Sequence, residues 1–222
     1  MTDQLKYNTA VLSTVVFLVP VICGFVMYKN LNKAEKLFLF YLFIGCVTDF
    51  SVMSLQQYNK LLAIIIFNMY SIFEPFFLAV YFYLIAPTKF IRKTCVVILA
   101  LLIPVWLIKH VQIFNHGSLI QKLSGNFYTW YQVVFAFIAA YVLLLMTQIR
   151  EESLRKSQLW IVIGTFISTF CSFFLSSFLT TEYQTYMWVV YSFVNLLSYM
   201  VVTYAFLLTK EKKTMSYPGF GR

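Results

Sequence analysis

Long uninterrupted apolar runs limit the possible folds of this chain more than any other feature. A helix that crosses a bilayer needs about 20 mostly apolar residues. Because lipid cannot hydrogen-bond to the backbone, only helices and closed barrels span it, and continuous rather than alternating runs are typical of helices. We therefore predict an all-α polytopic membrane protein with seven transmembrane helices. They are expected over Val11–Tyr28, Leu37–Leu55, Leu61–Ala86, Cys95–Ile108, Tyr128–Thr147, Gln158–Phe178 and Tyr186–Leu208.

The composition supports this assignment. Hydrophobic residues make up 61% of the 222 residues and charged residues only 11%, whereas a soluble domain is roughly 45–50% apolar and about 25% charged. We expect one seven-helix membrane domain over residues 1–208 and a short basic tail over 209–222, with no soluble domain.

Basic residues are distributed unevenly between the two sides of the predicted membrane domain. With the N-terminus outside, thirteen of the 17 Lys and Arg residues lie on the inner side. Cytoplasmic loops carry such an excess, so the N-terminus is predicted outside and the C-terminus inside. The net charge of +9 then reflects topology and attraction to anionic lipid, not nucleic-acid binding. Aromatic residues near the predicted helix ends, including Tyr128 and Tyr131, are expected to form an interfacial belt.

Two carboxylates, Asp49 and Glu74, fall inside predicted spans, while Glu35 and the other acidic residues fall in loops or tails. An ionised residue at a helix centre costs about 2.5–3.5 kcal/mol in insertion experiments. No Lys or Arg inside a span is available to pair with either carboxylate. Both are therefore expected to face the bundle interior, Asp49 about 10 Å and Glu74 about 20 Å below the outer surface.

A polar stripe accompanies Glu74 in the stretch NMYSIFEPFFLAVYFY. Asn68, Ser71 and Glu74 recur every three residues, on one side of a helix. Pro75 follows at once; its ring clashes with the carbonyl of Ser71, which predicts a kink. Asn68 is expected at the depth of Asp49, within hydrogen-bonding reach if the two helices pack face to face.

The chain also contains an internal similarity. An offset of 121 aligns residues 7–89 with 128–210 and places Glu74 on Asn195. This predicts two three-helix repeats joined by the helix over Cys95–Ile108, a 3+1+3 organisation. The alternative is chance similarity within a narrow composition. The aligned identical pairs in the third and seventh spans are Tyr70/Tyr191, Ser71/Ser192, Val80/Val201, Tyr83/Tyr204, Thr88/Thr209 and Lys89/Lys210.

The 3+1+3 organisation with an outer N-terminus is similar to that of SWEET-type sugar-efflux carriers. In that family an asparagine in each of helices 3 and 7 faces the substrate, and Glu74 and Asn195 occupy those positions here. Of the proline set that the carriers have in the first two helices of each repeat, only Pro20 is present.

A second resemblance rests on FYLFIGCVTDF, followed by NMYSIFEPFFLAVYFY. These runs resemble a group of small seven-helix proteins of Bacteroidota inner membranes for which no activity is known. This similarity implies a bacterial inner-membrane location.

Enzymatic activity is not expected. Neither histidine, His110 or His116, lies in the interior of a predicted span, so a membrane zinc hydrolase would lack ligands. No Ser-His-Asp arrangement is available there either. No lysine stands between Tyr186 and Leu208 to bind retinal. No metal or cofactor is expected.

We therefore predict a small-solute carrier with a mid-membrane pocket formed by Glu74, Asp49, Asn68, Ser71 and Asn195. Its expected partners are the lipid bilayer and a small polar or cationic solute. One alternative is a receptor-like subunit that senses a ligand and signals to a cytoplasmic protein, and another is a structural subunit of a membrane complex. The intramembrane hydroxyls and Asn195 also have a purely structural interpretation, as contacts between helices.

Overall fold

A computed structural model describes residues 2–114, 120–148, 156–178 and 184–209. In these four stretches every regular element is helical, and six helices are long and apolar enough to cross a membrane. The chain is therefore a multi-pass helical membrane protein, which confirms the predicted class. The elements are α1 (Thr2–Val26), η1 (Tyr28–Asn30), α2 (Lys33–Tyr58), α3 (Lys60–Ile85), α4 (Lys89–Phe114), α5 (Ile120–Gln148), α6 (Lys156–Phe178) and α7 (Gln184–Leu208).

The helices extend beyond the apolar runs that predicted them. The fourth run, expected over Cys95–Ile108, belongs to a helix of 26 residues that begins at Lys89. Long basic side chains can bury their stems and keep their charges in water, so a helix continues past the end of its apolar stretch. The apolar part of α1, Val11–Val26, is shorter than those of the other six, and its role as a seventh span stays a prediction.

Some sequence predictions concern residues outside the described stretches. These include His116 and the predicted basic tail beyond Thr209.

Two asparagines set the ends of α2. Asn32 forms a capping box with Glu35: the Asn32 side chain accepts from the Glu35 N–H at 2.9 Å, and the Glu35 carboxylate accepts from the Asn32 N–H at 2.8 Å. Such a box satisfies N–H groups that a helix start leaves without partners. Asn59 ends α2 and caps α3 by accepting from the Leu62 N–H at 3.1 Å. A single residue thus separates α2 from α3, which makes them a tight antiparallel pair.

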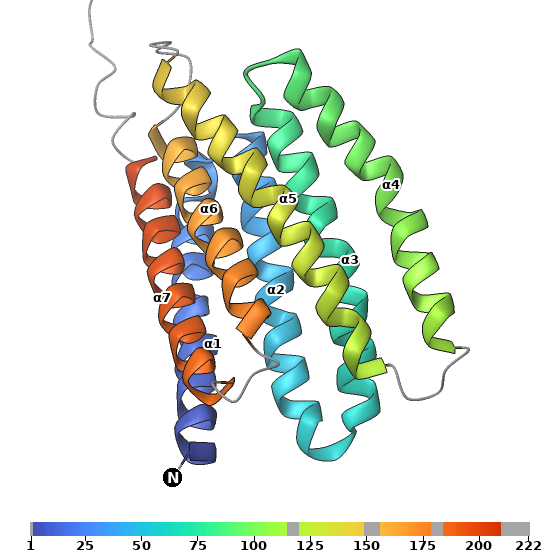
Figure 1. The fold of residues 1–222 in the computed structure, drawn as a ribbon. Helices are drawn as coiled ribbons and strands as arrows, with labels where there is room; N and C mark the ends of the chain where they lie inside the picture. Colours follow the sequence, from blue (N-terminus) through green and yellow to red (C-terminus); the bar gives the residue numbers. More distant parts are fainter. Residues whose placement is uncertain (1, 115–119, 149–155, 179–183, 210–222) are drawn as a thin grey trace, which may run out of the picture.

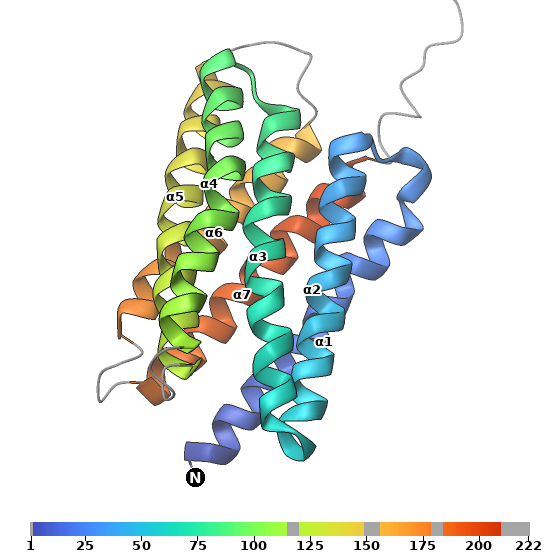
Figure 2. The same ribbon diagram turned by 90° about the vertical axis from the view of Figure 1, so that its right-hand side faces the viewer.

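Six of the helices form a closed ring. Around it, α1 packs on α2, α2 on α3, α3 on α5, α5 on α6, α6 on α7 and α7 on α1, while α4 lies outside against α3 and α5. Figure 1 shows one layer of α7, α6 and α5 in front of α1, α2 and α3, with α4 at the side. Figure 2, turned by 90°, shows the same arrangement from the α4 side. In this order α3 lies opposite α7, and α2 lies opposite α6.

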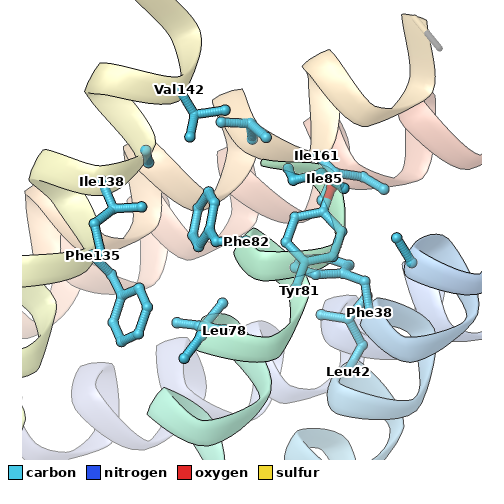
Figure 3. Packing of buried hydrophobic residues seen from close by; sticks show 14 of the residues in the cluster. Phe38, Leu42, Leu78, Tyr81, Phe82, Ile85, Phe135, Ile138, Val142 and Ile161 are labelled. Atoms are coloured by element: carbon cyan, nitrogen blue, oxygen red, sulfur yellow. The ribbon is translucent and has the colours of Figure 1, made fainter. Parts of the chain in front are cut away.

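The two ends of the ring differ in their interior. One end, named here the η1 end, carries η1 and the predicted inner loops; the other, the Asn59 end, carries the α2–α3 turn and the N-terminus. Most of the large buried apolar side chains lie in the η1 half, where they point toward one another between the layers (Figure 3). They fill this half of the ring with an apolar core. The side chains labelled in Figure 3 are Phe38, Leu42, Leu78, Tyr81, Phe82, Ile85, Phe135, Ile138, Val142 and Ile161.

Small residues allow close approach between neighbouring helices. A Cβ at Gly164 of α6 would lie 2.9 Å from the Val202 side chain and 3.4 Å from the Ser198 carbonyl oxygen of α7. Membrane helices associate largely through such close packing, because lipid provides no hydrophobic drive between them. Gly164 therefore sets the separation of α6 and α7.

We expect Gly164→Leu to destabilise the protein by about 1–3 kcal/mol, because the added side chain would push α7 away from α6. The measurement is thermal unfolding of purified protein in detergent. Ala100→Leu on the exposed face of α4 is the control and should leave the melting temperature unchanged. Equal melting temperatures for the two variants would contradict the assigned α6–α7 contact.

Candidate functional site: a carboxylate among tyrosines

Glu74, near the middle of α3, is the centre of a polar cluster inside the ring. Its carboxylate accepts hydrogen bonds from Tyr131 of α5 at 2.5 Å, from Tyr41 of α2 at 3.2 Å and, more weakly, from the Gln132 amide of α5 at 3.5 Å. All three donors are neutral, so the cluster contains no cation to balance an ionised Glu74. The carboxylate is held by donors from both neighbouring helices of the ring, as the sequence predicted for a residue facing the interior.

Gln132 presents an acceptor that no described residue uses. Its side chain is 1% exposed, and while its amide nitrogen approaches Glu74, its amide oxygen has no hydrogen-bond donor within the described stretches. A buried polar atom without a partner costs about 1–3 kcal/mol. The interior next to Glu74 therefore offers acceptor oxygens on two side chains to any group that carries N–H or O–H donors.

A second hydroxyl network connects this cluster to Asn195. Asn195 of α7 is 9% exposed and is hydrogen-bonded to Tyr191, whose hydroxyl lies 3.3 Å from that of Tyr128 of α5. The Tyr128 ring packs edge-on against that of Tyr131, with centroids 5.2 Å apart. Glu74 and Asn195, on opposite helices of the ring, are thus joined through three tyrosines.

The remaining predicted site residues lie nearby but are used differently. Asp49 is close enough to Glu74, Tyr70 and Tyr199 for electrostatic interaction. Within the described residues it is not hydrogen-bonded to Asn68, the contact that face-to-face packing of α2 and α3 would have allowed.

Within the predicted stripe on α3, the Ser71 hydroxyl bonds inside its own helix, whereas Glu74 is bonded by neighbouring helices. The Ser71 hydroxyl donates to the Asn68 carbonyl oxygen at 2.6 Å. The helix continues through Pro75, which is buried.

Sequence reasoning missed the contact of Tyr131 with Glu74. Tyr131 and Tyr128 were both predicted in the interfacial belt, yet Tyr131 is 1% exposed and binds Glu74. The start of the span was not the error, because the apolar stretch of α5 begins at Phe127, one residue from the predicted start. The sequence does not show which side of α5 faces the interior. The available signal was Gln132, an amide within an apolar span that lies one helical turn from Tyr128.

Glu35 was also assigned wrongly, to a loop. It is fully buried in the first turn of α2, and its carboxylate accepts a hydrogen bond from Ser157 of α6 at 2.5 Å. Because α2 and α6 are opposite members of the ring, this bond crosses the ring at the η1 end. Tyr81 of α3, 1% exposed, lies close enough for electrostatic interaction with Glu35. We call the Glu35–Ser157 pair the cross-ring bond.

Together these features define a helical membrane protein with a tyrosine-lined carboxylate in its interior and a closed η1 end. The cluster is suited to accepting hydrogen bonds or positive charge. Comparison with protein-family models, curated proteins and solved structures finds no match for the chain.

We expect Tyr131→Phe to destabilise the protein by about 1–3 kcal/mol, because Glu74 loses its shortest hydrogen bond while it remains partly buried. Thermal unfolding in detergent measures the change. Tyr204→Phe, which removes the hydroxyl of a half-exposed tyrosine on α7, is the control. If both variants unfold at the wild-type temperature, the Tyr131–Glu74 bond contributes nothing.

Ser157→Ala removes the cross-ring bond and should destabilise the protein by about 1.5–3 kcal/mol, the range for a hydrogen bond to a charged group. Hydrogen exchange should become faster in the first turns of α2 and α6, because the η1 end opens more often. Ser51→Ala, whose hydroxyl bonds only within α2, should leave this exchange unchanged. Unchanged exchange in Ser157→Ala as well would mean that the bond does not hold this end closed.

Proposed function

We propose that this protein is a carrier for a small polar or cationic solute that binds at Glu74. The observation that carries the proposal is the acceptor pair at the centre of the ring: the Glu74 carboxylate and the unpartnered Gln132 oxygen beside it. Intramembrane ionisable residues are expensive and commonly mark substrate or proton pathways. A solute with ammonium or hydroxyl donors would satisfy both acceptors.

The ring order supports the repeat organisation that the sequence predicts. A two-fold axis along the membrane normal would exchange α1 with α5, α2 with α6 and α3 with α7, and the packing order of the six helices is compatible with that exchange. It would also relate Glu74 to Asn195. Helix α4 packs outside the ring against α3 and α5, which is where a helix linking two repeats is expected to lie. Parallel repeats of this kind occur in transporters.

The difference between the two ends supports alternating access. The η1 half holds the apolar core and the cross-ring bond, whereas the Glu74 cluster lies on the side of this core that faces the Asn59 end. With the proposed orientation, N-terminus outside in a bacterial inner membrane, the described state is closed toward the cytoplasm. Transport would require the cross-ring bond to break.

A receptor-like subunit is the second candidate, favoured by the same closed end. A receptor needs a ligand path from one side only and would use ligand binding at Glu74 to shift α2 and α6. Transport in proteoliposomes separates the two candidates, because only a carrier moves solute across the bilayer.

The first test is a thermal-shift screen of the purified protein against primary and quaternary ammonium compounds, polyols and sugars at pH 5.5 and 8. A solute at 100 times its Kd stabilises the folded state by about 2.7 kcal/mol. We expect a stabilising compound whose effect is lost in Glu74→Gln. Its effect should also be weaker at pH 5.5, because a proton on Glu74 competes with a donor group of the solute.

Asp49→Asn is the matched control, since it neutralises the other intramembrane carboxylate. A compound that still stabilises Glu74→Gln but no longer stabilises Asp49→Asn would indicate a binding site nearer the Asn59 end. A compound that stabilises both variants as strongly as wild type would refute binding at either carboxylate.

A further inference from the structure

A groove on the outer surface of the bundle lies between α4 and α5. It has a volume of about 270 Å³ and is lined by Phe90, Ile91, Thr94, Phe137, Ile138 and Tyr141. All three α4 residues belong to the first turns of that helix, so the groove lies near the η1 end. There α4 leans away from α5 (Figure 1).

The groove offers an apolar surface. Its floor is formed by Ile91 and Ile138, which are buried, and its sides by Phe90 and Phe137, which are 66% and 74% exposed. The one aliphatic hydroxyl, that of Thr94, donates to the Phe90 carbonyl oxygen at 3.1 Å within its own helix. In a bilayer such a surface faces hydrocarbon. Its chemistry therefore fits an acyl chain.

Positive charge borders the same end of the groove. Lys89, Arg92 and Lys93 are exposed in the first turns of α4, and neither α4 nor α5 contains an acidic residue that could neutralise them. Lys89 and Lys93 are one helical turn apart and are therefore neighbours on the helix surface. Each directly precedes a groove residue, Phe90 or Thr94. Arg92 differs, because its guanidinium donates to the Ala86 carbonyl oxygen at 3.4 Å.

We propose that this groove binds one anionic phospholipid, with an acyl chain between α4 and α5 and its phosphate at Lys89 and Lys93. Basic pockets between membrane helices on the cytoplasmic side recognise anionic head groups, and the predicted topology puts these lysines on that side. The charge selects the head group, and the groove holds the chain. The site is separate from the Glu74 cluster and does not depend on the proposed transport function.

Native mass spectrometry of the full chain tests the proposal, with phosphatidylglycerol or phosphatidylcholine of equal chain length added to the detergent. We expect wild type to retain one phosphatidylglycerol in preference to phosphatidylcholine. Lys89→Gln/Lys93→Gln should lower that preference roughly thirtyfold, because each lysine contributes about fivefold. Lys29→Gln/Lys33→Gln, which removes two exposed lysines of the same end away from the groove, should keep it.

Two further measurements distinguish the contribution of the acyl chain to binding from that of the head group. Thr94→Phe, which fills the groove and keeps both lysines, should also lose the bound lipid. Inorganic phosphate should not compete at millimolar concentration, because it has no chain. Equal loss of preference in the two lysine variants, or retention of lipid in Thr94→Phe, would overturn the proposal. Circular dichroism and elution volume verify that each variant is folded.

Discussion

The hydrogen bonds to Glu74 are the interaction on which the interior of this protein depends. A carboxylate in the middle of a bilayer has no water to solvate it, so the protein must supply donors or the cost of burial remains. Tyr41 and Tyr131 supply them from the helices on either side of α3. The carboxylate thus ties α2, α3 and α5 together at a depth where hydrophobic contacts alone cannot distinguish helix from lipid.

Neutral hydroxyls, not cations, surround this carboxylate. An internal ion pair would satisfy Glu74 permanently and leave little reason for a ligand to bind. Tyrosine hydroxyls can donate to an ionised carboxylate and can accept from an incoming group, so the same network is compatible with the proposed site both empty and occupied. The second network, from Tyr128 through Tyr191 to Asn195, carries this property to the opposite side of the ring. The apolar core and the Glu35–Ser157 bond close the interior of the ring toward the η1 end.

The helices were predictable because their signal is one of composition. In lipid, a single apolar segment of this length can satisfy its backbone hydrogen bonds only as a helix. Each predicted run lies within or largely within one observed helix. The ends were less predictable: α4 and α5 both start earlier than their apolar runs, since polar residues continue a helix into the membrane surface. The start of α2 was also predicted too late, which placed Glu35 in a loop. The contact of Tyr131 was missed for another reason: no local pattern shows which side of α5 faces the interior.

That this chain is a helical membrane protein, and that Glu74 faces protein and not lipid, could be predicted from the residues alone, because both conclusions follow from the cost of polar groups in hydrocarbon. Which side chains contact that carboxylate could not be predicted in this way. Tyr41, Tyr131 and Gln132 come from two other helices, and no local pattern specifies the rotation of one helix against another. The same reason applies to Glu35 and Ser157: their contact depends on the closure of the whole ring, which is a property of six helices packed together.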